Sequence, residues 1–216
     1  MDRQRQRGVS LISLMIGLLV SLMAVMGMMA LYRTVVHATA ESGVYAQLAG
    51  DRSAALLAAH SYVQAAGFGI DTAAVGTDLG VCTPNNPQAG LSGSGCAPQG
   101  RGRLLLWRLA DGAMRCAGLH ITATGGLEYL QPQACVGGIG SASWTAGQRQ
   151  SLFAAGQLAA GFVELESRNE PCQALGVAGG GAVLVRLQAR HPVAADLATD
   201  TESVPVYSST CLVNFK

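Results

Sequence analysis

The sequence predicts an α+β protein: a long N-terminal helix, transmembrane in its first half, packed on a small antiparallel β-sheet domain with disulfides. Three observations predict it. An uncharged apolar run at 9–31 follows a short basic leader. Apolar residues then continue at helical spacing to about residue 66. Beyond residue 69, short strand-like segments alternate with Gly-rich turns, and all six cysteines lie in this part of the chain.

The apolar run has no Asp, Glu, Lys or Arg from Val9 to Leu31. As a helix, its 23 residues span about 34 Å, enough to cross a hydrocarbon core of about 30 Å. Three arginines precede it and Arg33 follows it, so the leader is expected in the cytoplasm and the remainder outside. A cleaved signal peptide has a shorter apolar region, of about 7 to 15 residues. We therefore expect a retained membrane helix.

The junction before this run carries a motif of seven consecutive residues: Gly8, Val9, Ser10, Leu11, Ile12, Ser13 and Leu14. It resembles the class III signal of type IV prepilins, in which a prepilin peptidase cuts after a glycine and methylates the new N-terminus. The resemblance implies a leader at 1–8, processing between Gly8 and Val9, and assembly through Ser10 to Leu14. The mature chain then has 208 residues, the full 216 less the leader.

The motif departs from the family pattern at Ser13, where that family has glutamate. There the glutamate is thought to neutralise the N-terminal amine of the earlier-added subunit, because an isolated charge in an apolar core is costly. A subunit without a predecessor has no such amine to neutralise. The departure therefore suggests entry first, at or near the pilus tip; simple tolerance of serine in a low-copy subunit is the alternative.

Residues 32–69 are expected to continue the helix as an amphipathic segment. We expect one helix over about 10–66, ended by Gly67 and Gly69. Within it, 50–57 and then 65–69 resemble the helix of PilW-type minor pilins, apart from an inserted Asp51. The segment 206–214 is similar to the last strand of that family. These matches do not cover the middle of the chain.

The exported domain at 70–216 is expected to be β-rich. Six segments have strand character: 103–109, 118–123, 127–131, 161–166, 182–190 and 204–215. The segment 182–190 alternates well, with Val183, Val185, Leu187 and Ala189 on one face. In contrast, 76–102 has no convincing period and many Gly, Pro, Asn and Ser residues, so a long exposed loop is expected.

All six cysteines lie in this domain: Cys82, Cys96, Cys116, Cys135, Cys172 and Cys211. An even number of exported cysteines suggests three disulfides, with buried free thiols as the alternative. Among 15 connectivities we favour the sequential one. There is no C-x-x-C and the histidines are scattered, so no metal is expected.

Charge and motifs argue against catalysis and nucleic-acid binding. Without the leader the chain has 11 basic and 12 acidic residues, which gives no support for nucleic-acid binding. No catalytic or cofactor motif occurs, so no cofactor and no enzymatic activity are expected. Glu164 and Glu166 would share a strand face, which is more typical of a solvated surface than of paired catalytic carboxylates.

Two further groups are expected to be structural. Four arginines form a modest basic cluster, read as a charged surface or subunit contact: Arg101, Arg103, Arg108 and Arg115. Trp107 and Trp144 are expected in a core or an interface.

The resemblance implies a non-catalytic minor pilin that primes type IV pilus assembly. Its expected partners are other minor pilins, the major pilin and the prepilin peptidase. It would first cross the inner membrane once, with its C-terminal domain in the periplasm, and then join the extracellular pilus. A type II secretion minor pseudopilin and a membrane-anchored adhesive or binding module are the alternatives.

Overall fold

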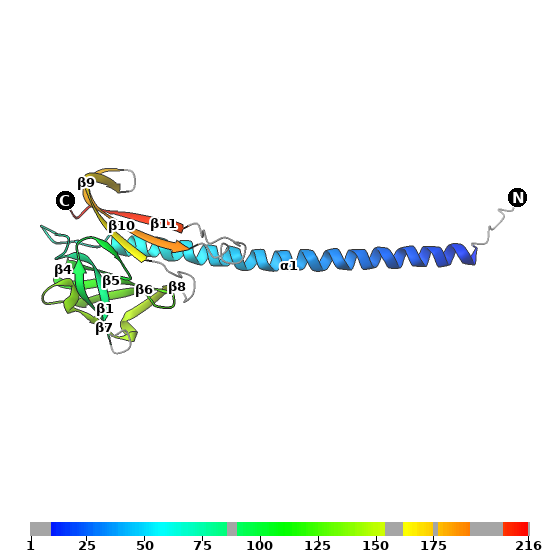
Figure 1. Ribbon diagram of the computed structural model, residues 1–216, viewed down its shortest axis with the longest axis horizontal. Coiled ribbons are helices and arrows are strands. Elements are labelled where there is room, and N and C mark those ends of the chain that lie inside the picture. Colours follow the sequence, from blue (N-terminus) through cyan, green and yellow to red (C-terminus); the bar gives the residue numbers. More distant parts are fainter. Residues whose placement is uncertain (1–9, 86–89, 154–161, 175–176, 191–204, 216) are drawn as a thin grey trace. The chain divides into compact units, whose positions relative to one another are not determined.

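The computed structural model describes residues 10–85, 90–153, 162–174, 177–190 and 205–215 (Figure 1). The chain divides into two compact units, Met1–Leu48 and Ala49–Lys216. The expected leader, with Gly8 and Val9, lies outside the described residues.

The helix α1 runs from Leu11 to Val63, through 53 residues and both units. It ends three residues before the expected Ala66, because the amide groups of Ala65 and Ala66 bond to carbonyls three residues back rather than four. The turn that follows needs Gly69, whose φ is +71°. A Cβ there would lie 2.1 Å from the carbonyl oxygen of Ala110. The expected glycine termination therefore has a steric basis.

The second unit contains two sheets whose strand pairs are all antiparallel. The seven-stranded sheet has the order β7 (Ser143–Trp144), β2 (Leu91–Ala97), β1 (Leu79–Asn85), β4 (Leu104–Asp111), β5 (Ala113–Ile121), β6 (Leu127–Ala134) and β8 (Arg149–Phe153). The four-stranded sheet has the order β11 (Pro205–Leu212), β10 (Val177–Arg190), β9 (Phe162–Ala174) and β3 (Gly100–Gly102). Two short 3₁₀ helices, η1 (Ile139–Ser141) and η2 (Ala146–Gln148), lie between β6 and β8. The structure is thus compatible with the expected α+β class.

The end of α1 packs on both sheets, one on each side of it in Figure 1. We call this cluster the helix-side core. It comprises Ala55, Ala59, Val63 and Ala66 near the helix end, Leu79, Val81, Leu105, Trp107, Ala117, Leu119, Ile121, Leu127 and Phe153 from the larger sheet and its flanks, and Val183, Val185, Leu187, Leu212 and Phe215 from the C-terminal segments. Small helix residues at three- and four-residue spacing let the sheets approach closely. The predicted inward face of 182–190 is confirmed at Val183, Val185 and Leu187.

A second cluster covers the opposite face of the larger sheet, and we call it the far-side core. It comprises Cys82, Leu91, Leu104, Leu106, Cys116, Leu130, Cys135, Ile139, Ala142 and Trp144. Trp144 is fully buried and its indole N–H donates to the carbonyl of Gln131 at 2.7 Å. Trp107 is fully buried in the helix-side core. Both tryptophans therefore have the expected core role.

The expectation of a long exposed loop at 76–102 is wrong. Most of this segment forms β1, β2 and β3, and β1 pairs with β4 inside the larger sheet. Its glycines serve close packing as well as turns. A Cβ on Gly93 would lie 2.6 Å from Leu106 Cδ1 and 2.9 Å from Cys82 Cβ. Glycine content therefore concealed a strand whose backbone must approach its neighbours closely.

Three disulfides join the cysteines as Cys82–Cys96, Cys116–Cys135 and Cys172–Cys211. This is the sequential pairing that we favoured. The first joins the neighbouring strands β1 and β2. The third joins β9 to β11 across the intervening β10, so it ties the last strand to its sheet.

Candidate functional site

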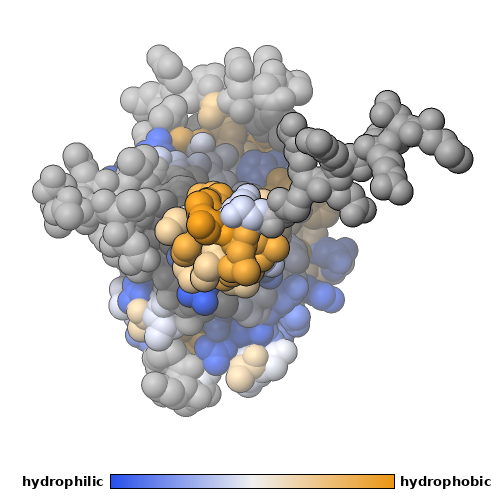
Figure 2. All heavy atoms as spheres, turned by 90° about the vertical axis from the view of Figure 1, so that its right-hand side faces the viewer, coloured by the Kyte–Doolittle hydropathy of each residue, from blue (hydrophilic) through white to orange (hydrophobic). Residues whose placement is uncertain are grey.

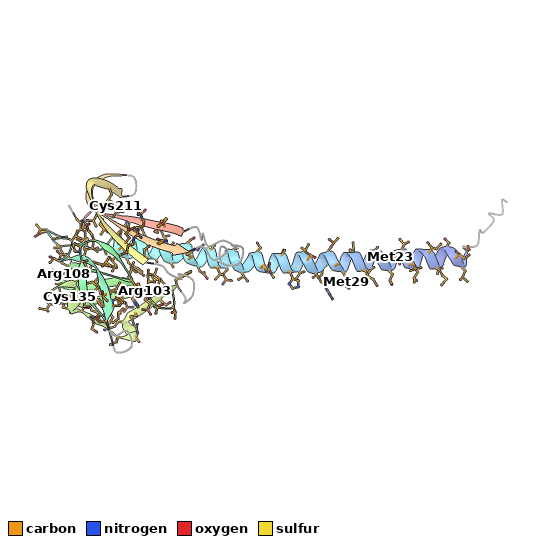
Figure 3. All side chains as sticks on the ribbon, in the orientation of Figure 1. Met23, Met29, Arg103, Arg108, Cys135 and Cys211 are labelled. Atoms are coloured by element: carbon orange, nitrogen blue, oxygen red, sulfur yellow. A yellow bond between two sulfur atoms is a disulfide. The ribbon has the colours of Figure 1, made fainter. Side chains whose placement is uncertain are left out.

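The most distinctive surface of the first unit is the apolar start of α1. It carries 15 large apolar side chains between Leu11 and Leu31, each 52–77% exposed. The mean hydropathy of its most apolar stretch is 2.4, and none of that stretch is buried. Figure 2 views this end of the helix and shows apolar residues around it, and in Figure 3 Met23 and Met29 project outward. A helix that is apolar all round requires a membrane or an apolar partner.

The first turn of this helix is built from the motif residues. The carbonyl of Ser10 accepts from the amide groups of Ser13 and Leu14, at 3.0 and 3.3 Å. Leu11, Ile12 and Leu14 are all exposed, and no acidic residue occurs in this turn. The described motif residues thus form a short apolar surface without a carboxylate that could neutralise an amine.

Hydroxyl groups along this helix bond to its own backbone. Ser21 donates to the carbonyl of Leu18 at 2.9 Å, and Thr34 donates to that of Ala30 at 3.0 Å. These bonds keep polar atoms satisfied in an apolar medium. We expect the hydroxyl of Ser13 to bond in the same way to the carbonyl one turn before it, which belongs to Val9 and lies outside the described residues.

The four arginines expected as a basic cluster do not form a single charged patch. Arg108 bonds to Asp78, with Nη1 and Oδ1 3.2 Å apart, and Arg101 bonds to Glu164 at 2.8 Å. Arg103 donates to the carbonyl of Thr122, whereas Arg115 is exposed on β5. Figure 3 shows Arg103 and Arg108 well apart within the domain. The separate partners explain why sequence proximity did not produce one patch.

Glu164 is an ion-pair residue. Its carboxylate accepts from Arg101 and, at 3.2 Å, from Arg186. The hydrogen bond from Arg101 is the main cause that lowers the pKa of this carboxyl group. The side chain of Glu166 lies outside the described part of the chain, so the expectation that it shares a strand face with Glu164 stays a prediction.

Three polar groups, centred on Asp78, His60 and His120, were not predicted from the sequence. Asp78 is buried and accepts the amide of Ala74 at 3.0 Å, in addition to its pair with Arg108. His60 is within hydrogen-bond distance of the buried Thr210 at 2.7 Å, and so joins the helix to the last strand.

The third group is centred on His120, which contacts Glu128 at 3.0 Å across the β5–β6 pair. Burial lowers the pKa of His120, against the opposing effect of Glu128. The sequence holds a signal for this last pair, since both residues flank the same Gly-Gly turn at 125–126. Among the described residues there is no group of three metal-ligating side chains.

Comparison of the chain with known protein families, with curated protein sequences and with solved structures finds no match.

Proposed function

We propose that this chain is a minor pilin of the PilW type that primes type IV pilus assembly. The observation that carries the proposal is the apolar surface of α1, which continues as one helix into a disulfide-bonded α+β domain. In the prepilins that the motif resembles, such a helix is kept after processing. It would serve first as the inner-membrane anchor and then as the filament core.

The size of the apolar surface explains why the helix needs a non-aqueous environment throughout assembly. A fully buried Leu, Ile, Val or Met side chain contributes about 1.5–3 kcal/mol. The 15 exposed apolar side chains therefore need a lipid or protein environment at every stage. Other minor pilins and the major pilin would replace lipid around them. The domain's role is to present surfaces to those partners, without a reaction of its own.

Processing at Gly8 tests the proposal. In cells with an active prepilin peptidase, mass spectrometry should find a mature chain that starts at N-methylated Val9. Gly8→Leu should leave an uncleaved chain in the membrane, because the peptidase needs a small residue there. Gly17→Leu is the matched control, since a Cβ at that position has open space around it. Wild-type protein that keeps residues 1–8 would contradict the proposal.

Ser13 also favours a second candidate, a type II secretion minor pseudopilin, because some of those subunits share the missing glutamate. The two functions differ in what a deletion removes. Loss of pili and twitching with normal secretion supports the pilus role, and the reverse supports the secretion role.

A further inference from the structure

A hollow of about 310 Å³ lies in the second unit. Its lining comes from β1, β5 with the turn that follows it, the residue before β4, and the start of β8. The lining residues are Pro84, Arg103, His120–Thr124 and Arg149. The volume is at the lower end of small-ligand sites and suits a group the size of one amino acid.

The basic side chains of the hollow come from three different elements. Arg103 precedes β4, His120 lies on β5, and Arg149 begins β8. The nearby acid is Glu128, with its carboxylate 3.0 Å from His120 Nδ1 and 3.6 Å from Arg149 Nη1. With His120 neutral, two arginines against one glutamate leave a net charge of +1. A monoanion matches that charge.

Both guanidinium groups have hydrogen-bonding capacity left. The only acceptor that the described residues give Arg103 is the carbonyl of Thr122. The Nε–H of Arg149 is buried and has no acceptor within the described part of the chain. The distance from Arg149 to Glu128 exceeds an ordinary hydrogen bond. A planar guanidinium fits the two oxygens of a carboxylate especially well.

The remaining lining is mostly apolar. Pro84, Ile121 and Ala123 contribute carbon surface, and the hydroxyls of Thr122 and Thr124 lie 3.0 Å from each other at the turn. A ligand with a carboxylate and a small apolar body would satisfy both parts of the lining. Phosphate fits less well, because its second charge would face Glu128 without compensation.

We propose that this hollow binds a monocarboxylate with a small apolar body, of the kind found at the C-terminus of a peptide. The proposal goes beyond the assembly function and does not depend on it. A bound carboxylate adds negative charge beside His120, whose other charged neighbours are Glu128, Arg149 and Arg103. Binding should therefore raise the pKa of His120, and by reciprocity a lower pH should tighten binding.

The test uses the full chain in lipid nanodiscs, with ¹³C-labelled histidine. The chain has four histidines, and His120→Gln assigns the signal of interest. N-acetyl-leucine should shift the His120 signal saturably and raise its pKa. N-acetyl-leucine amide, which has no carboxylate, should not. Empty nanodiscs correct for partition of the probe into lipid.

Variants separate this site from general charge effects. Arg103→Gln should weaken binding about tenfold or more, since it removes charge-assisted hydrogen bonds. Arg115→Gln, which removes an exposed arginine outside the lining, should bind as wild type does. Equal binding of the amide, unchanged affinity in Arg103→Gln, or no saturable shift would overturn the proposal. Tighter binding of phosphate or glucuronate would overturn the assignment of an apolar monocarboxylate.

Discussion

The single side chain of Asp78 links several elements of this domain. It lies just before β1, is buried, and accepts from both the amide of Ala74 and the guanidinium of Arg108. The backbone of Arg108 in turn accepts from Gly67 and donates to the carbonyl of Asp78. The carboxylate thus connects the entry to β1, the strand β4 and the turn that ends α1.

We predict that Asp78→Ala destabilises the domain by about 3–5 kcal/mol, because it leaves the largely buried Arg108 without its counter-charge. Asp78→Asn should cost less, since the amide oxygen can still accept from Ala74. Urea unfolding followed by tryptophan fluorescence measures this, because both tryptophans are buried in this unit. Asp111→Asn, at an exposed aspartate, is the control and should change little. A loss below about 1 kcal/mol for Asp78→Ala would mean that the pair is only a surface interaction.

We predict that the stability of the domain depends on pH through His120, with a sign that follows from the lowered pKa of this residue. The unfolded chain, with an ordinary histidine pKa of about 6.5, binds a proton at a higher pH than the folded chain does. The free energy of unfolding should therefore fall as the pH drops from about 7 through 6.5 and level off below the folded-state pKa. His120→Gln should remove this part of the pH dependence. An unchanged profile in that variant would exclude His120 as its source.

At the scale of elements, segments with a strong periodic pattern could be predicted from the sequence, whereas strands that depend on close packing could not. The long helix and the strands around 103–109, 118–123, 127–131 and 182–190 follow from patterns within the sequence, whereas the sequential disulfide pairing was one choice among 15 connectivities. The strands β1 and β2 were missed because their glycines permit close contacts with other elements: Gly93 of β2 lies against Leu106 of β4, and Gly80 of β1 lies against Ile139. Likewise the Asp78–Arg108 pair joins residues 30 positions apart, with no local signal. The apolar surface at the start of α1 was predictable because it depends on composition alone.

The disulfides allow a prediction that compares two elements. Cys172–Cys211 closes a separation of 39 residues and Cys82–Cys96 one of 14. On chain entropy alone, replacing each pair by alanine should cost about 4 and about 3 kcal/mol respectively. Urea unfolding of the two double variants measures the difference. A larger loss for the shorter loop would show that packing against the far-side core, rather than the restricted unfolded chain, dominates.

At the scale of the whole molecule, the chain combines an apolar helix surface without an acidic first turn and a domain held by three disulfides. Because Ser13 provides no carboxylate, the helix cannot neutralise the N-terminal amine of a neighbouring subunit. A subunit below could still pair its own glutamate with the amine of Val9. A subunit above would bring an amine that Ser13 cannot neutralise, at the cost of an isolated charge in an apolar core. If the chain is a minor pilin, as proposed, this asymmetry favours a place at or near the tip.

Site-specific cross-linking tests that placement. We predict that a photoreactive residue at position 13 captures only subunits below, because no N-terminus lies above it to be captured. The same probe at Met23, which is exposed further along the helix, is the control and should capture whatever neighbours the filament provides. Ser13→Glu should not improve assembly if the chain has no predecessor, since the new carboxylate would have no amine to pair with and would itself be an isolated charge. Regular capture of an N-terminus from a subunit above would refute the tip position and leave serine as a tolerated residue in the shaft.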